Sequence, residues 1–244
     1  MDKECQAKEK RIERRILWRF YEQSKQADMK ILELFAGSRS IGKIAEERGH
    51  EVFSVDLKDF EGINLAKDIE DLMPDDIPFK PDMIWASPPC TTYSMAGIRF
   101  HRPNEKHPNR KKSEFAFKSD NLVRNTLKII DYFNCIYYIE NPRALLRKQS
   151  FMRGIPRTTV WYCTYGAITA KPTDIWSNNI YSIFNPTGWY PRAECFNGNI
   201  NCHHEPSPRG AQTGLQGIKG NYNRSKIPNE LCIEIIKATE LKFL

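Results

Sequence analysis

Short apolar runs alternate along the chain with stretches whose apolar residues have helical spacing. The runs of strand length cover 31–35, 52–55, 83–86, 135–139 and 159–165. The stretches with helical spacing cover 41–48, 122–133 and 228–241. This order predicts an α/β fold with a mostly parallel sheet, and such sheets bind their ligands at the carboxyl ends of the strands.

Composition divides the chain into four parts. Residues 1–28 are strongly charged and have apolar residues at helical spacing, which predicts an N-terminal amphipathic helix. Residues 29–176 form the expected sheet core, which carries the chemistry. Residues 177–215 are rich in Asn, Gly, Pro and aromatic side chains and predict a small loop-rich segment, and 216–244 predict a strand and helix that return to the core.

The first predicted strand ends in a turn of small residues, Phe35-Ala36-Gly37-Ser38, where a ligand can approach the backbone at a helix N-terminus. Asp56 ends the second strand and could bind ribose hydroxyls, or it could cap the next helix. The same two alternatives hold for Asp68 after the third short apolar segment, with an exocyclic amine as its ligand. Neither GxGxxG nor GxxxxGK[ST] occurs, which favours a nucleoside-like cofactor without phosphates.

Two further strands also end in special sequences. Ser87-Pro88-Pro89-Cys90 holds a cysteine in a rigid turn, where the thiol could act as a nucleophile or could simply be a small buried apolar group. Glu140-Asn141-Pro142 places a carboxyl group at the end of an apolar strand, where desolvation favours its protonated, proton-donating form. The alternative for Glu140 is a helix cap.

These elements resemble the motifs of the cytosine-specific C5 DNA methyltransferases. The matching sequences are Phe35-Ala36-Gly37, Asp56, Pro88-Pro89-Cys90, Glu140-Asn141-Pro142 and, more weakly, Arg224-Ser225-Lys226-Ile227-Pro228, and they occur in the order of that family. The resemblance implies a Rossmann-like methyltransferase sheet, S-adenosylmethionine as cofactor and double-stranded DNA as partner.

The resemblance also implies roles for individual residues. Cys90 would add to C6 of a cytosine that is turned out of the duplex, and Glu140 would support N3. The cofactor would contact Phe35, Gly37, Ser38, Asp56, Asp68, Ser87 and Ser225. The sequence leaves two alternatives open: the same chemistry on tRNA, and a catalytically silent relative that only binds nucleic acid.

The net charge of +7 favours a polyanionic partner, and the positions of the basic residues indicate where that partner would bind. The stretch 99–118, shortly after the cysteine turn, contains seven basic residues and only two acidic ones. We expect this loop to contact phosphates, although a charged run can also be a solvated surface. The candidate DNA contacts are Arg99, Arg102, Arg110, Lys111 and Lys112, with Arg192, Arg209 and Trp189 in the small segment.

One motif of the family is missing. The family carries an arginine in the strand after the Glu-Asn-Pro element, where it helps to hold the cytosine, but residues 159–165 contain none. Lys171 could replace it at the base, as a third catalytic candidate, or could be a surface lysine. The loop-rich segment is also shorter than the target-recognition domains of the family, which predicts a short or degenerate target.

The seven cysteines are scattered, which argues against a disulfide framework of a secreted protein. Cys195, Cys202 and His204 could bind a structural Zn²⁺ with one further ligand such as Cys163, or they could be ordinary residues of a small domain.

The cellular setting is predicted from what the sequence lacks. No run approaches the roughly 20 apolar residues of a membrane span, and the charged N-terminus has no secretory signal. We therefore expect a soluble protein of a bacterial or viral-host cytoplasm. A monomer is the expected state, and a cognate restriction nuclease is a candidate partner.

Overall fold

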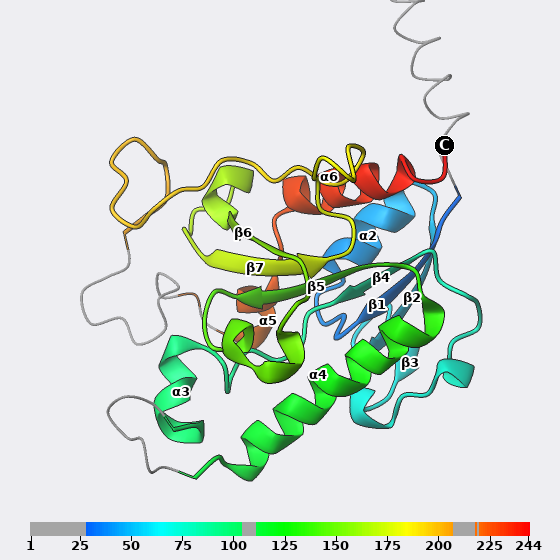
Figure 1. Cartoon of the computed structure of the whole chain (residues 1–244), viewed down its shortest axis with the longest axis horizontal. Coiled ribbons are helices and arrows are strands. Elements are labelled where there is room, and N and C mark those ends of the chain that lie inside the picture. Colours follow the sequence, from blue (N-terminus) through cyan, green and yellow to red (C-terminus); the bar gives the residue numbers. More distant parts are fainter. Residues whose placement is uncertain (1–27, 104–110, 207–217, 219) are drawn as a thin grey trace, which may run out of the picture.

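Seven strands form one sheet in the order β3-β2-β1-β4-β5-β7-β6 (Figure 1). The computed structural model describes residues 28–103, 111–206, 218 and 220–244, so the helix predicted over 1–28 lies outside the described residues except for its last position. The strands are β1 (Lys30–Leu34), β2 (Glu51–Asp56), β3 (Leu65–Ala66), β4 (Met83–Ala86), β5 (Ile136–Pro142), β6 (Arg157–Trp161) and β7 (Pro172–Ser177). All neighbours are parallel except β7, which is antiparallel to both β5 and β6. The predicted α/β fold is confirmed.

Helices cover both faces of this sheet. The helix α2 (Ser40–Glu47) packs with α6 (Asn229–Glu240) on one face, and α4 (Glu114–Phe133) covers the other (Figure 1). Side chains of β1 alternate between the two layers, with Ile31 in the α2/α6 core and Leu32 in the α4 core. A strand that is buried on both faces has a nearly continuous apolar sequence, and the sequence of β1 therefore predicts a strand. No helix in the described part of the chain is long and apolar enough to span a bilayer.

The shorter elements lie mainly in the connections. The two short α-helices are α3 (Met95–His101) and α5 (Asn221–Ser225). The 3₁₀ helices are η1 (Ile69–Asp71), η2 (Pro74–Asp76), η3 (Leu146–Lys148), η4 (Ser150–Met152) and η5 (Tyr162–Tyr165).

Three element predictions need correction. The strand expected over 159–165 covers Arg157–Trp161 and then turns into η5, which ends at Gly166 with a left-handed φ of 86°. The helix expected from 122 starts at Glu114, where the Ser113 side chain caps it by accepting a hydrogen bond from the Ala116 N–H. Within the described residues of 216–244 the chain forms α5 and α6 and no strand.

The sheet brings the predicted motifs to one edge. The carboxyl ends of the parallel strands meet at the same edge, and the register pairs Leu34 with Ala86 and Ala86 with Ile139. Because β7 runs in the opposite direction, its first residues lie at this edge as well, with Thr173 opposite Pro142. The turns that follow β1, β2, β4 and β5 therefore share one location with the start of β7.

Candidate active site

The turn after β1 is tightly wound. Phe35, Gly37 and Arg39 have φ angles of 57°, 47° and 54°, all in the left-handed region that is unfavourable for side-chain-bearing residues. Asp56 at the end of β2 fixes this turn, because its Oδ2 accepts the Gly37 N–H at 3.0 Å. Its Oδ1 accepts the Lys58 N–H at 3.0 Å. Each carboxylate oxygen has a second lone pair, so Asp56 retains acceptor capacity for a ligand hydroxyl.

The C-terminal segment returns to the same turn. A Cβ placed on Gly37 would lie 3.9 Å from Asp56 Oδ2 and 3.9 Å from Ser225 Oγ, so these three residues border one small space. Ser40 Oγ accepts the Ile227 N–H at 3.1 Å and lies 2.9 Å from Ser38 Oγ. The structure thus brings together four of the predicted cofactor residues: Gly37, Ser38, Asp56 and Ser225.

The other predicted cofactor residues have internal partners. Asp68 caps η1 by accepting the Glu70 N–H at 3.1 Å, and it forms an ion pair of 2.7 Å with Lys118, which matches the capping alternative. Ser87 Oγ accepts the Trp85 Nε1–H at 2.9 Å. Phe35 packs against the core on the α4 side. Contact of Asp68, Ser87 and Phe35 with a cofactor stays a prediction.

A buried amide joins the cysteine turn to the end of β5. Asn141 Nδ2 donates to the Pro88 carbonyl oxygen at 2.8 Å, and Asn141 is 1% exposed. Cys90 follows two residues after this carbonyl, and Glu140 directly precedes Asn141. The predicted nucleophile and the predicted acid are therefore held on adjacent strands at one edge.

Glu140 is buried and has polar neighbours. The Tyr162 hydroxyl donates to Glu140 Oε1 at 2.9 Å, and Lys171 Nζ lies 4.0 Å from the same oxygen. Burial raises the pKa of Tyr162 well above its usual value, so this hydroxyl keeps its proton and remains a donor. The capping alternative for Glu140 is wrong, because its carboxyl group contacts side chains at the edge of the sheet.

The electrostatic environment of Cys90 has opposing contributions. Burial raises the pKa of the Cys90 thiol, and the nearby Glu140 raises it further, whereas Lys171 and Arg224 lower it. The thiol therefore favours its protonated form in this state. The two cations provide the counter-charge that a thiolate needs.

Lys171 is not a surface lysine. Its side chain is 10% exposed, its Nζ donates to the Arg224 carbonyl oxygen at 3.1 Å, and it lies 4.5 Å from the Tyr162 ring centroid. Its φ of 24° is in the left-handed region, and such strain is typical of functional positions. β6 does contain an arginine, Arg157, but that residue pairs with Asp174 at 3.3 Å near the opposite end of the strand.

Two site residues were missed in the sequence. Tyr162 was expected within a strand, and only its position beside Glu140 reveals its hydrogen bond. Arg224 belongs to the weak C-terminal motif, where only Ser225 was considered. Together with Lys171, these two residues also line a cavity of about 400 Å³ between the 162–171 segment and the C-terminal segment, which Cys90 and Glu140 do not line.

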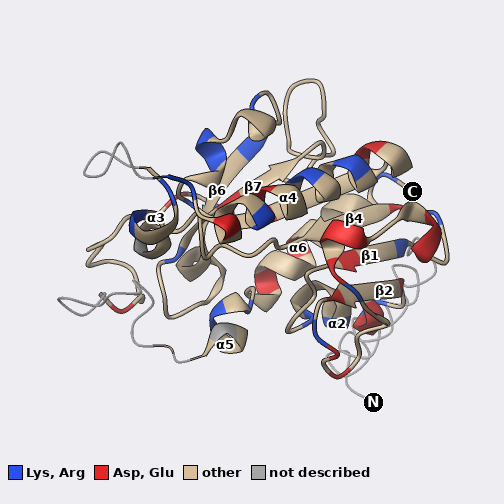
Figure 2. Ribbon diagram, turned by 90° about the horizontal axis from the view of Figure 1, so that it is seen from below, with Lys and Arg blue, Asp and Glu red and all other residues tan. Residues whose placement is uncertain are grey.

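The described basic residues of the 99–118 loop lie in α3, next to it and at the start of α4 (Figure 2), and only some of them are exposed. Arg102 is 3% exposed, and its guanidinium donates to the Thr92 carbonyl at 2.9 Å and to Asp120 at 2.7 Å, so the prediction of a phosphate contact is wrong for Arg102 in this structure. Lys112 also pairs with Asp120, whereas Lys111 and Arg99 are exposed. Arg110 and Arg209 lie outside the described residues.

Arg192 and Trp189, the two described candidates of the small segment, both contact the rest of the protein. Arg192 pairs with Glu230 at 2.5 Å and with Glu234 at 2.7 Å, so it joins this segment to α6. Trp189 is 2% exposed and packs against Tyr138 in the α2/α6 core. The prediction of a DNA contact is wrong for Trp189, which is buried. For Arg192, whose side chain is 37% exposed, a DNA contact stays a prediction.

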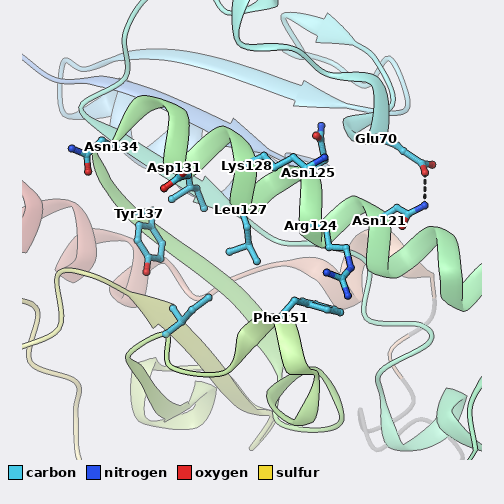
Figure 3. A pocket seen from close by; sticks show the side chains of 12 residues that line it. Glu70, Asn121, Arg124, Asn125, Leu127, Lys128, Asp131, Asn134, Tyr137 and Phe151 are labelled. Atoms are coloured by element: carbon cyan, nitrogen blue, oxygen red, sulfur yellow. Dashed lines mark hydrogen bonds between the residues drawn. The ribbon is translucent and has the colours of Figure 1, made fainter.

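Two other features include neither Cys90 nor Glu140. The predicted zinc ligands Cys195, Cys202 and His204 meet Cys163, and their ligand atoms all lie within 4.8 Å of one another. A groove of about 860 Å³ runs between α4 and the 151–155 segment, where Arg124 and Phe151 face each other (Figure 3). This groove follows α4, and none of Gly37, Asp56, Cys90 and Glu140 lines it.

Comparisons with known proteins agree with the motifs. The chain is 31% identical over 221 residues to a probable DNA (cytosine-5)-methyltransferase of frog virus 3 (isolate Goorha), a match that covers 85% of this chain and 99% of that protein. No family model matches the sequence.

Two solved methyltransferase structures match part of this chain. The Entamoeba histolytica methyltransferase EhMeth has a TM-score of 0.48 at 14% identity, covering 70% of this chain and 58% of its own. The S. pombe Dnmt2 methyltransferase has a TM-score of 0.41 at 13% identity, covering 68% and 57%. This chain therefore spans less than two thirds of both solved chains.

Proposed function

Because the chain belongs to the cytosine-5 DNA methyltransferase family, we propose that it methylates C5 of cytosine in DNA through a covalent bond between Cys90 and C6 of a base turned out of the duplex. The observation that carries this proposal is the environment of Cys90. The turn that carries Cys90 is held beside Glu140 by the hydrogen bond from Asn141 to the Pro88 carbonyl oxygen. Glu140 raises the pKa of the Cys90 thiol, whereas Lys171 and Arg224 lower it.

The residues at the end of β1 and β2 fit an S-adenosyl cofactor. Gly37 leaves room where a side chain would stand, and Asp56 and Ser225 provide oxygen atoms around the same space. Asp56 would hold the ribose hydroxyls, and the turn at Gly37 would hold the amino-acid part. When bound, S-adenosylmethionine supplies the methyl group.

The chain's own residues activate the base. Cytosine C5 is a weak nucleophile, and addition of the Cys90 thiolate to C6 moves electron density into the ring. Glu140 would support N3 by a hydrogen bond while this density develops. After C5 carries the methyl group, a base would take the C5 proton, and the electron pair of that C–H bond would re-form the C5–C6 double bond as Cys90 leaves as a thiolate.

Lys171 and Arg224 would take the place of the missing family arginine. Both lower the pKa of Cys90, and Lys171 lies beside Glu140. A cation at this position can stabilise the thiolate before attack and can donate to the cytosine O2.

The substrate is tested with labelled cofactor. Incubation with duplex DNA and with tRNA, followed by digestion to nucleosides, should place the label in 5-methyldeoxycytidine. Label only in the RNA digest would overturn the DNA assignment, and no label in either would favour a binding protein without activity.

The covalent step is tested with duplex DNA that contains 5-fluorocytosine, which traps the enzyme. A stable complex is expected for the wild type and for Cys135→Ala, a partly exposed cysteine that directly precedes β5 at the opposite end of that strand. Cys90→Ala should form none. Trapping that survives Cys90→Ala would contradict the assigned nucleophile.

A further inference from the structure

Four metal-ligating side chains converge beside η5. Cys163 comes from η5 itself, whereas Cys195, Cys202 and His204 come from the small segment. Their ligand atoms all lie within 4.8 Å of one another, and Cys195 Sγ lies 3.8 Å from His204 Nδ1. Residues more than 30 positions apart in sequence are thus brought together by the fold.

These separations fit a tetrahedral ion. Two ligand atoms bound to Zn²⁺ at about 2.3 Å for sulfur and about 2.0 Å for nitrogen are roughly 3.5–3.8 Å apart at a tetrahedral angle. The four groups need to move only slightly to reach this geometry. We propose that Cys163, Cys195, Cys202 and His204 form a structural Zn²⁺ site of the Cys₃His type.

The choice of histidine follows from the contacts. His203 and His204 are adjacent, but His203 Nε2 lies 3.0 Å from the Ala167 carbonyl oxygen, so this ring is engaged with the core. His204 is 7% exposed and presents Nδ1 to Cys195. Only His204 therefore belongs to the ligand set.

The site is closed, which indicates a structural role. Cys163 and Cys195 are buried in a small cluster with Trp161 and Ala170, and Cys202 packs against it. Asn199 Nδ2 lies 3.3 Å from Cys195 Sγ and would stabilise a thiolate by donating to it. Four protein ligands leave no open position for a substrate or water.

The position of the site indicates what a bound metal would stabilise. Residues 191–206 contain no helix or strand, and their described backbone contacts with the core include the Glu205 N–H to the Ile168 carbonyl at 2.9 Å. A zinc ion would cross-link this loop to the segment that runs from Tyr162 to Lys171. Both ends of that segment contact Glu140, so the metal would also hold the wall of the base pocket.

Metal content of the purified full chain tests the proposal without reference to activity. We expect one zinc per chain by elemental analysis for the wild type and for Cys135→Ser, whose thiol lies outside the cluster. Cys202→Ser and His204→Ala should retain less than a fifth of that zinc. Replacement of zinc by Co²⁺ should produce the charge-transfer absorption of thiolate–cobalt bonds and the strong visible bands of a tetrahedral site.

The Co²⁺ spectrum needs no variant, so the test remains valid even if a variant fails to fold. A wild-type chain without metal, iron in place of zinc, or a disulfide between two of the three cysteines would overturn the proposal. Limited proteolysis adds a structural readout, because chelation should accelerate cleavage within 191–206 at least tenfold and added zinc should reverse the effect. Cleavage that is insensitive to chelation would contradict the cross-linking role.

Discussion

Asn141 and Pro88 join the two chemical motifs of this protein through one hydrogen bond, from the Asn141 side-chain amide to the Pro88 carbonyl oxygen at 2.8 Å. Both groups are buried. Because proline has no N–H and Pro88 precedes Pro89, the backbone of the turn has few other ways to be anchored. The asparagine of the Glu-Asn-Pro motif therefore positions the turn that carries Cys90, and it need not touch the substrate.

Asn141→Ala should leave the Pro88 carbonyl buried without this donor and destabilise the fold by about 1–3 kcal/mol. We expect a larger loss in kcat than in cofactor affinity, because Cys90 would lose its alignment while Gly37 and Asp56 stay in place. Steady-state kinetics and cofactor titration separate the two effects. Asn121→Ala on the exposed side of α4 is the matched control, and equal losses in both variants would contradict the positioning role.

Replacement of Lys171 should change the titration of Cys90. Lys171 lowers the pKa of a thiol that burial and Glu140 raise, so Lys171→Met should shift the pH profile of Cys90 alkylation to higher pH. A shift of one pH unit corresponds to about tenfold slower alkylation below the pKa. The rate is measured by mass spectrometry of the Cys90 peptide during iodoacetamide treatment.

Lys171→Arg should retain most of the wild-type profile, because the charge remains. Lys128→Met, on the exposed face of α4, controls for a general loss of charge. An unchanged profile in Lys171→Met would show that Lys171 does not act on the thiol.

The sequence predicted the site residues at the carboxyl edge of the sheet more completely than the residues that surround them. Asp56 ends β2, Phe35 and Cys90 follow the ends of β1 and β4, and Glu140 lies near the end of β5. In a parallel sheet this pattern alone places them at one edge. The wall residues Tyr162 and Arg224 depend on where β6 ends and where the C-terminal segment returns, which no local pattern reveals. β7 was missed for a similar reason, since its polar Asp174 is buried only because Arg147 and Arg157 pair with it.

Charge was the least reliable guide. A basic side chain looks the same in sequence whether it is exposed or buried, and the outcome depends on acidic partners elsewhere. Arg102 is buried and pairs with Asp120, which lies 18 residues later. Arg192 is paired with two glutamates of α6. The cysteine and histidine set was easier to predict, because few residue types bind zinc and three of the four lie within ten positions.

Two basic residues of the same loop should therefore behave differently. Lys111→Ala removes an exposed charge and should reduce the dependence of log Kd on log salt by about one, as expected for one lost phosphate contact. Arg102→Ala should leave that slope unchanged and instead lower stability by about 3 kcal/mol, because Asp120 would lose a buried partner. Fluorescence anisotropy with a labelled duplex at several salt concentrations, combined with urea unfolding, distinguishes the two.

If Lys111→Ala leaves the salt slope unchanged, this part of the loop is only solvated. If Arg102→Ala flattens the slope without loss of stability, the buried ion pair does not describe the protein in solution. Glu114→Gln at the exposed start of α4 is a control for a nearby change of charge in the opposite direction.

Two buried carboxyl groups should give the stability of the fold opposite pH dependences. Glu33 of β1 accepts the backbone N–H groups of Ile41 and Gly42 at 3.2 Å, and burial raises its pKa to about 7. In the folded chain it therefore keeps a proton between pH 4.5 and 7 that the unfolded chain releases. Its contribution to stability is fully present below pH 4.5 and is lost as the pH rises to 7, by up to about 3 kcal/mol.

Glu240 of α6 behaves in the opposite way. Burial alone would raise its pKa, but hydrogen bonds from His50 and Arg48 lower it to about 2. Its contribution is present above pH 4.5 and is lost as the pH falls toward 2. Urea unfolding of the wild type, Glu33→Gln and Glu240→Gln at several pH values measures both effects.

Glu33→Gln keeps an oxygen acceptor for the two N–H groups but cannot ionise. The free energy of unfolding of Glu33→Gln should increase relative to that of the wild type as the pH rises from 5 to 8. The free energy of unfolding of Glu240→Gln should stay below that of the wild type by a constant amount over this range. The distinction matters for the site, because Glu33 stabilises the start of α2 and with it the turn at Gly37. If the Glu33→Gln and wild-type stabilities remain parallel from pH 5 to 8, Glu33 is ionised throughout, and the turn is held by a carboxylate rather than by a neutral acid.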